Sequence, residues 1–183
     1  MKIMKLIIIV YLIILSSCNN EVRNNNETET TDTLLKKTIT FPSNLLFLEN
    51  NKFKNINVVK QKINNKKKII SIVDGNCRKC IVNQLNQTDS LFNNILNSNP
   101  LIFILNVNKK DSAYFMNNLY PEINAKEIFL WDNNYNFERE NQLFTKDIYL
   151  RTFMVNDTNK IIHYGNPLFE PDLLKEYKRL INK

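Results

Sequence analysis

Apolar residues recur along the chain with two different periods, which predict where strands and helices form. Residues 68–73 and 101–107 are nearly continuous apolar runs of strand length, as expected for central strands covered on both faces. Residues 127–131 are a third candidate for a core strand. Between the first two runs, apolar side chains return about every 3.6 residues until residues 99–100, which predicts a helix. Its apolar positions are Ile81, Leu85, Leu91, Phe92, Ile95 and Leu96.

Polar and turn-forming residues divide the other apolar stretches into shorter elements. Residues 64–65 are both Asn and separate the β-branched run 56–63 from 68–73, which predicts a hairpin. Residues 111–112 offer Asp and Ser as caps for a short helix that ends before Pro121. This helix would carry Phe115, Met116 and Leu119.

The last third of the chain predicts a hairpin and a closing helix. We expect residues 135–144 to form a helical turn and a loop. Residues 149–155 and 160–164 flank the polar stretch 156–159 and predict an antiparallel hairpin. Pro171 suits the first position of the closing helix. The inward-facing residues would be Phe137, Leu143, Phe144, Leu173, Leu174, Tyr177, Leu180 and Ile181. Strands that alternate with helices, followed by a hairpin and a helix, predict an α/β fold with a mixed central sheet and helices on both faces.

The composition is typical of one globular domain. Of the 183 residues, 43% are hydrophobic and 23% charged, with 2 Gly and 5 Pro, which excludes a collagen, a low-complexity scaffold and a polytopic membrane protein. The formal net charge of +7 becomes +5 if Lys2 and Lys5 are removed with a leader. Residues 50–68 are rich in Lys and Asn but lack interleaved aromatic side chains for base stacking, so we expect no nucleic-acid partner.

The N-terminus has the pattern of a signal peptide. Residues 1–17 begin with two lysines and continue with the ten apolar residues 6–15. As a helix, ten residues span about 15 Å, which is half of a hydrocarbon core of about 30 Å. The run is therefore too short for a stable membrane anchor, and we expect it to be removed.

Residues 15–18 match the lipobox of bacterial lipoproteins. The resemblance implies cleavage before Cys18 and diacylation of its side chain, and two acyl chains suffice for stable attachment to a membrane. An ordinary signal peptide with an incidental cysteine is the alternative. Asn19 replaces the Asp that retains some lipoproteins in the inner membrane. The sequence therefore does not decide whether the lipid lies in the inner or the outer membrane, or whether the domain lies in the periplasm or at the cell surface. The polar residues 18–33 would form a disordered tether.

The two remaining cysteines stand between the end of a core strand and the start of a helix. Unpaired amides and the macrodipole at a helix N-terminus, with the charges of Arg78 and Lys79, favour a thiolate at Cys77. Cys80, one turn into the helix, is expected to be shielded and to attack a mixed disulfide at Cys77. The chain has a single histidine, His163, so a four-ligand zinc site would need carboxylates.

This layout resembles the thioredoxin-like superfamily, especially the exported, membrane-tethered thiol-disulfide oxidoreductases of the TlpA/ResA kind, and thioredoxin-like lipoproteins of Gram-negative bacteria. The resemblance rests on the cysteine motif at 77–80 and on residues 152–155, 159–162 and 165–167. It implies that 56–183 form a thioredoxin-like domain. We assign 34–55 to an N-terminal extension, and the sequence leaves open whether this segment joins the sheet or packs against it. It further implies thiol-disulfide exchange in the cell envelope by Cys77 and Cys80, with protein thiols and disulfides as partners and no cofactor.

Several residues depart from the pattern of that superfamily. Asn76 replaces the usual Trp before the first cysteine, and Lys79 replaces a frequent Pro before the second. Leu150 occupies the place of a cis-proline beside the dithiol, and Ser71 that of a buried acid. Asp74 is the only carboxylate close in sequence, although its ordinary role is that of a residue in a strand-end turn. These departures leave turnover open.

Three functions thus remain for the cysteine pair: catalytic exchange, a static disulfide in a non-enzymatic surface-binding lipoprotein, and binding of Cu or Zn. Closing so short a loop contributes little to stability, which disfavours a purely structural disulfide. His163 lies in a β run, where packing is its ordinary role. Arg151 could bind an anionic partner, but we expect a surface charge.

Overall fold

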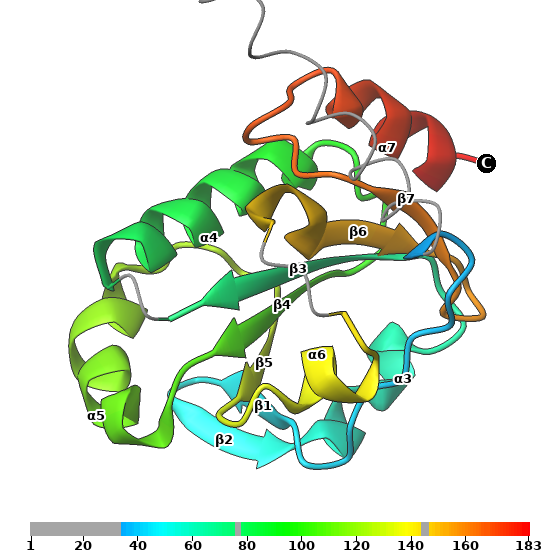
Figure 1. Ribbon diagram of the computed structural model, residues 1–183. Helices are drawn as coiled ribbons and strands as arrows, with labels where there is room; N and C mark the ends of the chain where they lie inside the picture. Colours follow the sequence, from blue (N-terminus) through cyan, green and yellow to red (C-terminus); the bar gives the residue numbers. More distant parts are fainter. Residues whose placement is uncertain (1–33, 76–77, 144–146) are drawn as a thin grey trace, which may run out of the picture. The chain divides into compact units, whose positions relative to one another are not determined.

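A seven-stranded mixed sheet forms the centre of the computed structural model, which describes residues 34–75, 78–143 and 147–183 (Figure 1). The strand order is β2-β1-β5-β4-β3-β6-β7. Residues 34–183 form one compact unit, whereas the predicted signal peptide at 1–17 and tether at 18–33 lie outside the described residues. The strands are β1 (Leu46–Glu49), β2 (Lys52–Asn55), β3 (Lys68–Asp74), β4 (Leu101–Asn106), β5 (Ile128–Asp132), β6 (Thr152–Val155) and β7 (Ile161–Tyr164).

The three predicted core strands are confirmed and lie side by side. β3, β4 and β5 are parallel to one another, with Ile70 opposite Ile102 and Ile102 opposite Ile128. Every residue of β4 and β5 is buried, as their apolar runs predicted. The carboxyl ends of these strands therefore meet at one edge of the sheet, which carries Asp74 and Asn106.

Helices cover both faces of the sheet, as expected for the predicted α/β architecture (Figure 1). The α-helices are α3 (Lys60–Ile63), α4 (Arg78–Asn93), α5 (Ser112–Tyr114), α6 (Asn136–Glu140) and α7 (Leu173–Ile181). Alternate strand residues point to opposite faces, so Ile69 packs in one core with α4 and α7, whereas Ile70 packs in the other with α3 and α6. No helix of the described residues is long and apolar enough to cross a membrane.

The hairpin predicted for residues 56–63 and 68–73 is wrong, because the first segment is helical. It forms a 3-10 turn, η1 (Ile56–Val58), and then α3. Its buried residues, Ile56, Val59 and Ile63, are spaced by three and four positions, which is the period of one helix face. The Asn55 side chain caps the turn by accepting a hydrogen bond from the Asn57 amide. The β-branched composition of this segment concealed the helical spacing.

Residues 34–55, for which the sequence left open an N-terminal extension or a part of the sheet, contribute two strands to the sheet. β1 pairs antiparallel with β5, with Leu46 opposite Trp131, and β2 pairs with β1. Asn50 and Asn51 connect them with φ of 52° and 61°, the left-handed conformation that a tight hairpin turn requires. The sheet therefore begins earlier in the chain than the thioredoxin-like segment we expected at 56–183.

The short helix predicted after residue 111 is broken into several turns. After η2 (Lys109–Asp111), one turn of α5 passes into a π-helical segment, η3 (Phe115–Leu119), and then into a 3-10 turn, η4 (Tyr120–Glu122). Phe115 is buried and its ring lies 5.1 Å from that of Trp131. Phe115 was among the apolar residues that the predicted helix would carry.

The predicted antiparallel hairpin is present as β6 and β7, although its first strand starts at Thr152 rather than at residue 149. The preceding residues form a 3-10 turn, η5 (Ile148–Arg151), which the Asp147 side chain caps by accepting a hydrogen bond from the Tyr149 amide. α7 starts at Leu173, so Pro171 precedes the helix instead of occupying its first position.

Candidate functional site: a cleft beside Cys80

Cys80 lies in the first turn of α4, directly after the carboxyl end of β3. It is disulfide-bonded, and the other two cysteines, Cys18 and Cys77, lie outside the described residues. The residue is exposed, whereas we expected it to be shielded within the helix. An exposed position follows from its place on the side of α4 that faces away from the sheet, where Asn83 and Gln87 are also exposed.

Gly75 joins the end of β3 to the end of β4. Its amide donates a hydrogen bond of 2.9 Å to the carbonyl oxygen of Asn106 at the end of β4. A Cβ atom on Gly75 would lie 2.6 Å from Val107 Cγ2 and 3.0 Å from that same oxygen. A larger residue here would require Val107 to move, so glycine suits this close approach of two strand ends.

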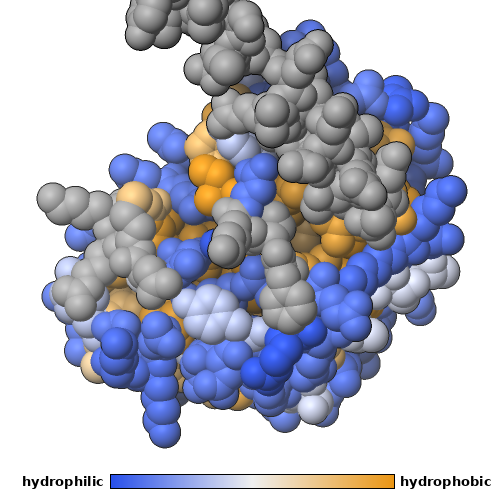
Figure 2. Space-filling model, viewed as in Figure 1, coloured by the Kyte–Doolittle hydropathy of each residue, from blue (hydrophilic) through white to orange (hydrophobic). Residues whose placement is uncertain are grey.

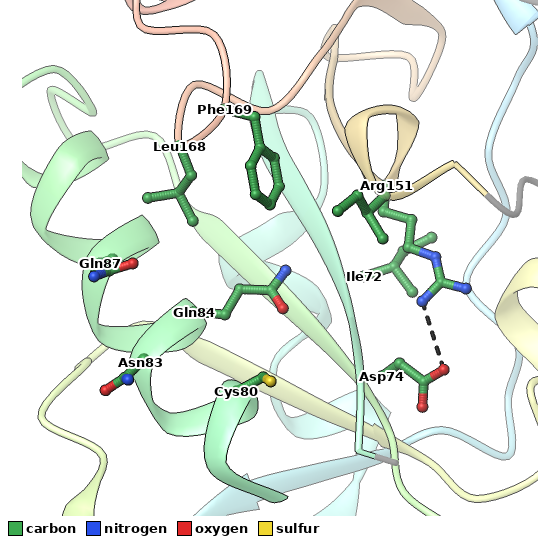
Figure 3. A pocket seen from close by; sticks show the side chains of 10 residues that line it. Ile72, Asp74, Cys80, Asn83, Gln84, Gln87, Arg151, Leu168 and Phe169 are labelled. Carbon is green, nitrogen blue, oxygen red and sulfur yellow. Dashed lines mark ion pairs between the residues drawn. The ribbon is translucent and has the colours of Figure 1, made fainter. Parts of the chain in front are cut away.

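A cleft of about 680 Å³ lies beside Cys80 (Figure 3). Side chains of α4 form one wall, and the loop between β7 and α7 and the turn η5 lie opposite. The end of β3 contributes to the floor with Ile72 and Asp74. The other lining residues are Asn83, Gln84, Gln87, Ile148, Arg151, Leu168 and Phe169.

The loop that carries Leu168 and Phe169 is held by internal hydrogen bonds. The fully buried Asn166 accepts a hydrogen bond of 3.0 Å from the Leu168 amide on its side-chain oxygen. Tyr177 of α7, also fully buried, donates from its hydroxyl to the carbonyl oxygen of Gly165 at 2.8 Å. These bonds fix the loop against β7 and α7, so this wall of the cleft is preformed.

Arg151 and Asp74 form an ion pair inside the cleft, marked in Figure 3, with 3.7 Å between the guanidinium and the carboxylate. Only 17% of the Arg151 side chain and 31% of the Asp74 side chain are exposed. The expectation that Arg151 is an ordinary surface charge is therefore wrong. The turn η5 places Arg151 just before the start of β6, which lies beside the carboxyl end of the antiparallel strand β3.

A buried carboxyl group that the sequence did not reveal lies near this ion pair. Glu138 of α6 is only 6% exposed and accepts a hydrogen bond from the Asn106 side chain. Burial raises the pKa of Glu138, and the nearby charge of Arg151 partly opposes this effect. The sequence predicts only a helical turn and a loop for residues 135–144. The apolar Phe137, which is buried, is the signal that this turn faces the core. Phe144 lies outside the described residues.

Ser71, His163 and Leu150, which the sequence also singled out, do not line the cleft. Ser71, at the place of the superfamily's buried acid, is fully buried and its hydroxyl lies 3.0 Å from that of Thr152. His163 does not line the cleft. Its ring lies 4.7 Å from that of Tyr177, and burial lowers its pKa. Leu150 lies within η5, and no peptide bond among the described residues is cis.

A site for a metal ion would need several ligands close together. The described residues contain no group of three His, Cys, Asp or Glu side chains that could hold a metal ion. The cleft thus brings together Cys80, Asp74 and Arg151, and the chemistry it presents is that of a disulfide-bonded cysteine beside one partly buried ion pair.

Sequence comparisons do not relate the chain to a known group, since neither a protein-family model nor a curated protein matches it. Solved structures do match. An uncharacterized thioredoxin-like protein from Porphyromonas gingivalis is 20% identical, with a TM-score of 0.51, and the match covers 80% of this chain and 94% of that protein.

Two further matches carry functional descriptions of their own. The thioredoxin domain of a thiol-disulfide oxidoreductase from Bacteroides vulgatus is 11% identical, with a TM-score of 0.52 and coverage of 81% of this chain and 99% of that domain. An exposed lipoprotein thioredoxin from Streptococcus pneumoniae is 15% identical, with a TM-score of 0.51 and coverage of 74% and 98%. At these identities the likeness concerns the fold, and it agrees with the mixed sheet and its helices. The chain has a thioredoxin-like fold.

Proposed function

We propose that Cys77 and Cys80 exchange disulfides with other proteins. The observation that carries this proposal is the position of Cys80, which is disulfide-bonded, exposed and part of the lining of an open cleft. Thiol-disulfide exchange requires that an attacking thiolate reach a sulfur atom, and exposed disulfides are the labile ones.

The exchange proceeds in two displacements. In the reduced protein, the Cys77 thiolate attacks one sulfur of a client disulfide, which forms a mixed disulfide and releases one client thiolate. The Cys80 thiolate then attacks the Cys77 sulfur, which forms the Cys77–Cys80 disulfide and releases the second client thiolate. Two electrons pass from the protein to the client, and a thiol-containing donor protein returns them.

The position of Cys77 in the sequence supports thiolate chemistry at this residue. This residue directly precedes α4, a helix of 16 residues whose unpaired amides and macrodipole favour negative charge at its start. Arg78 and Lys79 follow in sequence and add positive charge. Together these effects lower the pKa of a thiol and raise the fraction of thiolate at neutral pH.

The competing function is a non-enzymatic binding module in which the disulfide is static. The cleft itself is compatible with that reading, since a binding protein also needs a cavity. Two features favour exchange: the exposure of Cys80, and the small stabilisation that a disulfide across so short a loop contributes.

We also propose that Cys18 is lipidated and tethers the domain to a membrane of the bacterial cell envelope. The lipobox at 15–18 supports this, and the matched protein from Streptococcus pneumoniae is described as an exposed lipoprotein. The domain would then act in the periplasm or at the cell surface, an oxidising location where clients carry disulfides.

Reduction of a small aromatic disulfide by the pre-reduced chain tests the exchange. In a Cys18→Ala background, we expect release of two aromatic thiolates per protein molecule, followed by absorbance. The Cys77→Ser variant should not release aromatic thiolate at a rate comparable to that of the parent. Release by the parent protein no faster than by a variant that lacks both Cys77 and Cys80 would leave the static disulfide as the function.

A further inference from the structure

Basic residues are distributed unevenly along the chain. Residues 34–73 contain nine lysines and one acidic residue, Glu49, whereas residues 74–183 contain thirteen basic and thirteen acidic residues. The excess positive charge of the domain therefore comes from its first forty residues. Where the fold places these residues decides which surface of the domain attracts anions.

Two segments far apart in sequence, residues 34–39 and the tip of the β6–β7 hairpin at 156–160, lie side by side. The Ile39 amide donates a hydrogen bond of 2.8 Å to the carbonyl oxygen of Asn159. The Asn159 side chain in turn accepts a hydrogen bond of 2.5 Å from the ammonium of the buried Lys68, the first residue of β3. Both segments therefore lie at the end of the sheet where β3 starts.

Residues 60–67 complete this end of the molecule. They include α3 and lead directly into β3. Ile63 of α3 packs in the same core as Leu34 and Ile39. Figure 1 shows α3, the blue segment that starts at Leu34 and the orange hairpin tip together on the right of the view. We call the three segments 34–39, 60–67 and 156–160 the basic end.

The basic end carries seven lysines whose side chains are exposed or half-buried, and a single acidic residue, Asp157. The lysines are Lys36, Lys37, Lys60, Lys62, Lys66, Lys67 and Lys160. Figure 2 shows the right-hand rim of the same view as mostly hydrophilic. None of the large hydrophobic residues that are exposed in the described part of the chain lies in the three segments. A partner of the basic end would therefore be attracted by charge.

The basic end is remote from the cleft beside Cys80. Lys68 begins β3, and Asp74, which lines the cleft, ends it. At about 3.3 Å per residue, the strand separates the two by about 20 Å. None of the seven lysines lines the cleft. A partner bound at the basic end would thus leave Cys80 accessible.

The route of the chain favours a bilayer as this partner. Leu34, the first described residue, lies within the basic end, and the sixteen steps from Cys18 to Leu34 span at most about 55 Å. Lipidation of Cys18, which this step takes from the proposed function, would keep the basic end within that distance of the membrane. An anionic bilayer also presents many negative headgroups on one surface, which suits lysines spread over three segments better than one small anion does.

We propose that the basic end binds the surface of a bilayer that contains anionic phospholipids, with the cleft beside Cys80 directed away from the membrane. Each lysine close to such a surface contributes roughly fivefold to the affinity. This attraction supplies a second attachment besides the lipid and gives the domain one orientation. The dithiol then meets soluble clients instead of lipid headgroups.

Vesicle binding by the chain from residue 19 tests the proposal. This chain lacks the apolar leader and the cysteine proposed to carry the lipid, but retains the compact unit 34–183. It should sediment with vesicles of phosphatidylglycerol and phosphatidylcholine and not with vesicles of phosphatidylcholine alone. Raising NaCl from about 50 mM to about 300 mM should weaken binding at least about tenfold, because salt screens exposed charges. Absence of binding, or equal binding to both kinds of vesicle, would overturn the proposal.

Two triple variants with the same change in net charge locate the binding surface. The first, Lys62→Gln, Lys66→Gln and Lys160→Gln, neutralises exposed lysines of the basic end. The second, Lys109→Gln, Lys110→Gln and Lys175→Gln, neutralises exposed lysines elsewhere. The first variant should bind the anionic vesicles at least about tenfold more weakly than the parent, and the second within about twofold of it. Equal losses would assign the binding to net charge and overturn the basic end as its site.

Two further measurements test the orientation and the occupant. Alkylation of Cys80 in the reduced chain by a soluble maleimide should proceed equally fast with and without anionic vesicles, and a markedly lower rate on vesicles would overturn the orientation. Glycerol phosphate, compared with NaCl at the same ionic strength, should not displace the chain. Specific displacement would make a soluble phosphate the occupant instead of a bilayer. Failure of vesicle binding would leave lipidation and exchange intact, because acyl labelling and disulfide reduction measure those separately.

Discussion

The positively charged side chain of Arg151 is largely buried. Its guanidinium lies 3.7 Å from the Asp74 carboxylate, and the buried Glu138 is nearby. Replacing Arg151 by Met removes the cation that both carboxylates face. We expect a loss of about 1–3 kcal/mol in the free energy of unfolding, measured with urea, because buried charges lose a partner. The control is Arg179→Met, which removes an exposed pair with Glu176 and should cause a smaller loss, because water screens exposed charges. Equal losses in the two variants would contradict the burial of Arg151.

Glu138 should make stability depend on pH in a defined direction. Its pKa is raised by burial above the ordinary value of 4.5, so the folded state holds the proton at pH values where the unfolded state has released it. Protonated Glu138 therefore contributes fully to the free energy of unfolding below pH 4.5. This contribution is lost as pH rises through the raised pKa of the folded state. The amide of Glu138→Gln does not titrate, so the variant does not lose this contribution. Between pH 4.5 and the raised pKa, the free energy of unfolding of the variant should therefore increase with pH relative to that of the parent.

The control for this titration is Glu140→Gln, which changes an exposed residue of the same helix. Urea unfolding at several pH values from 4 upward, followed for the three proteins, gives the comparison. A constant difference between Glu138→Gln and the parent at all pH values would show that Glu138 does not titrate differently in the folded state.

At the scale of elements, β1 and β2 make the segment before residue 56 part of the fold. Leu45, Phe47 and Leu48 are each at most 5% exposed, and β1 covers the edge of β5. A chain that starts at residue 34 should therefore unfold cooperatively on heating, whereas one that starts at residue 56 should aggregate or remain unfolded, since it exposes an apolar sheet edge. Cooperative unfolding of the shorter chain would show that 34–55 is an accessory extension.

The elements that could be predicted from the sequence are those whose burial leaves a clear period. β3, β4 and β5 are continuous apolar runs, and α4 and α7 have apolar residues at helical spacing. Residues 56–63 were assigned to a strand because β-branched side chains fit both a strand and a short helix that packs on a sheet. β1 and β2 are only four residues each, too short to show a period.

The candidate site was only partly predictable for a related reason. Cys80 was found because its motif is local in sequence. The pairing of Arg151 with Asp74, and the burial of Glu138, depend on side chains brought together from β3, α6 and η5 by the topology of the sheet. Their separation in the chain leaves no local pattern.

At the scale of the whole molecule, the lipobox predicts where the domain is held. Expression of the chain in a bacterium supplied with a labelled fatty acid should give a labelled protein, and Cys18→Ala should abolish the label, because the acyl chains attach through that sulfur. Cys77→Ser serves as the control for the loss of a different cysteine and should retain the label. Labelling that persists in Cys18→Ala would refute lipidation at this site.

Trapping of the mixed disulfide tests the proposed exchange most directly. In a Cys18→Ala, Cys80→Ser chain, Cys77 is the single remaining thiol, and its attack on a client disulfide cannot be resolved. Mass spectrometry should detect one client chain linked to Cys77, released by a reductant, and none when Cys77 is also replaced by Ser. Absence of this adduct after the chain is mixed with an excess of a reducible disulfide would contradict thiol-disulfide exchange and leave the disulfide at Cys80 as a static bond.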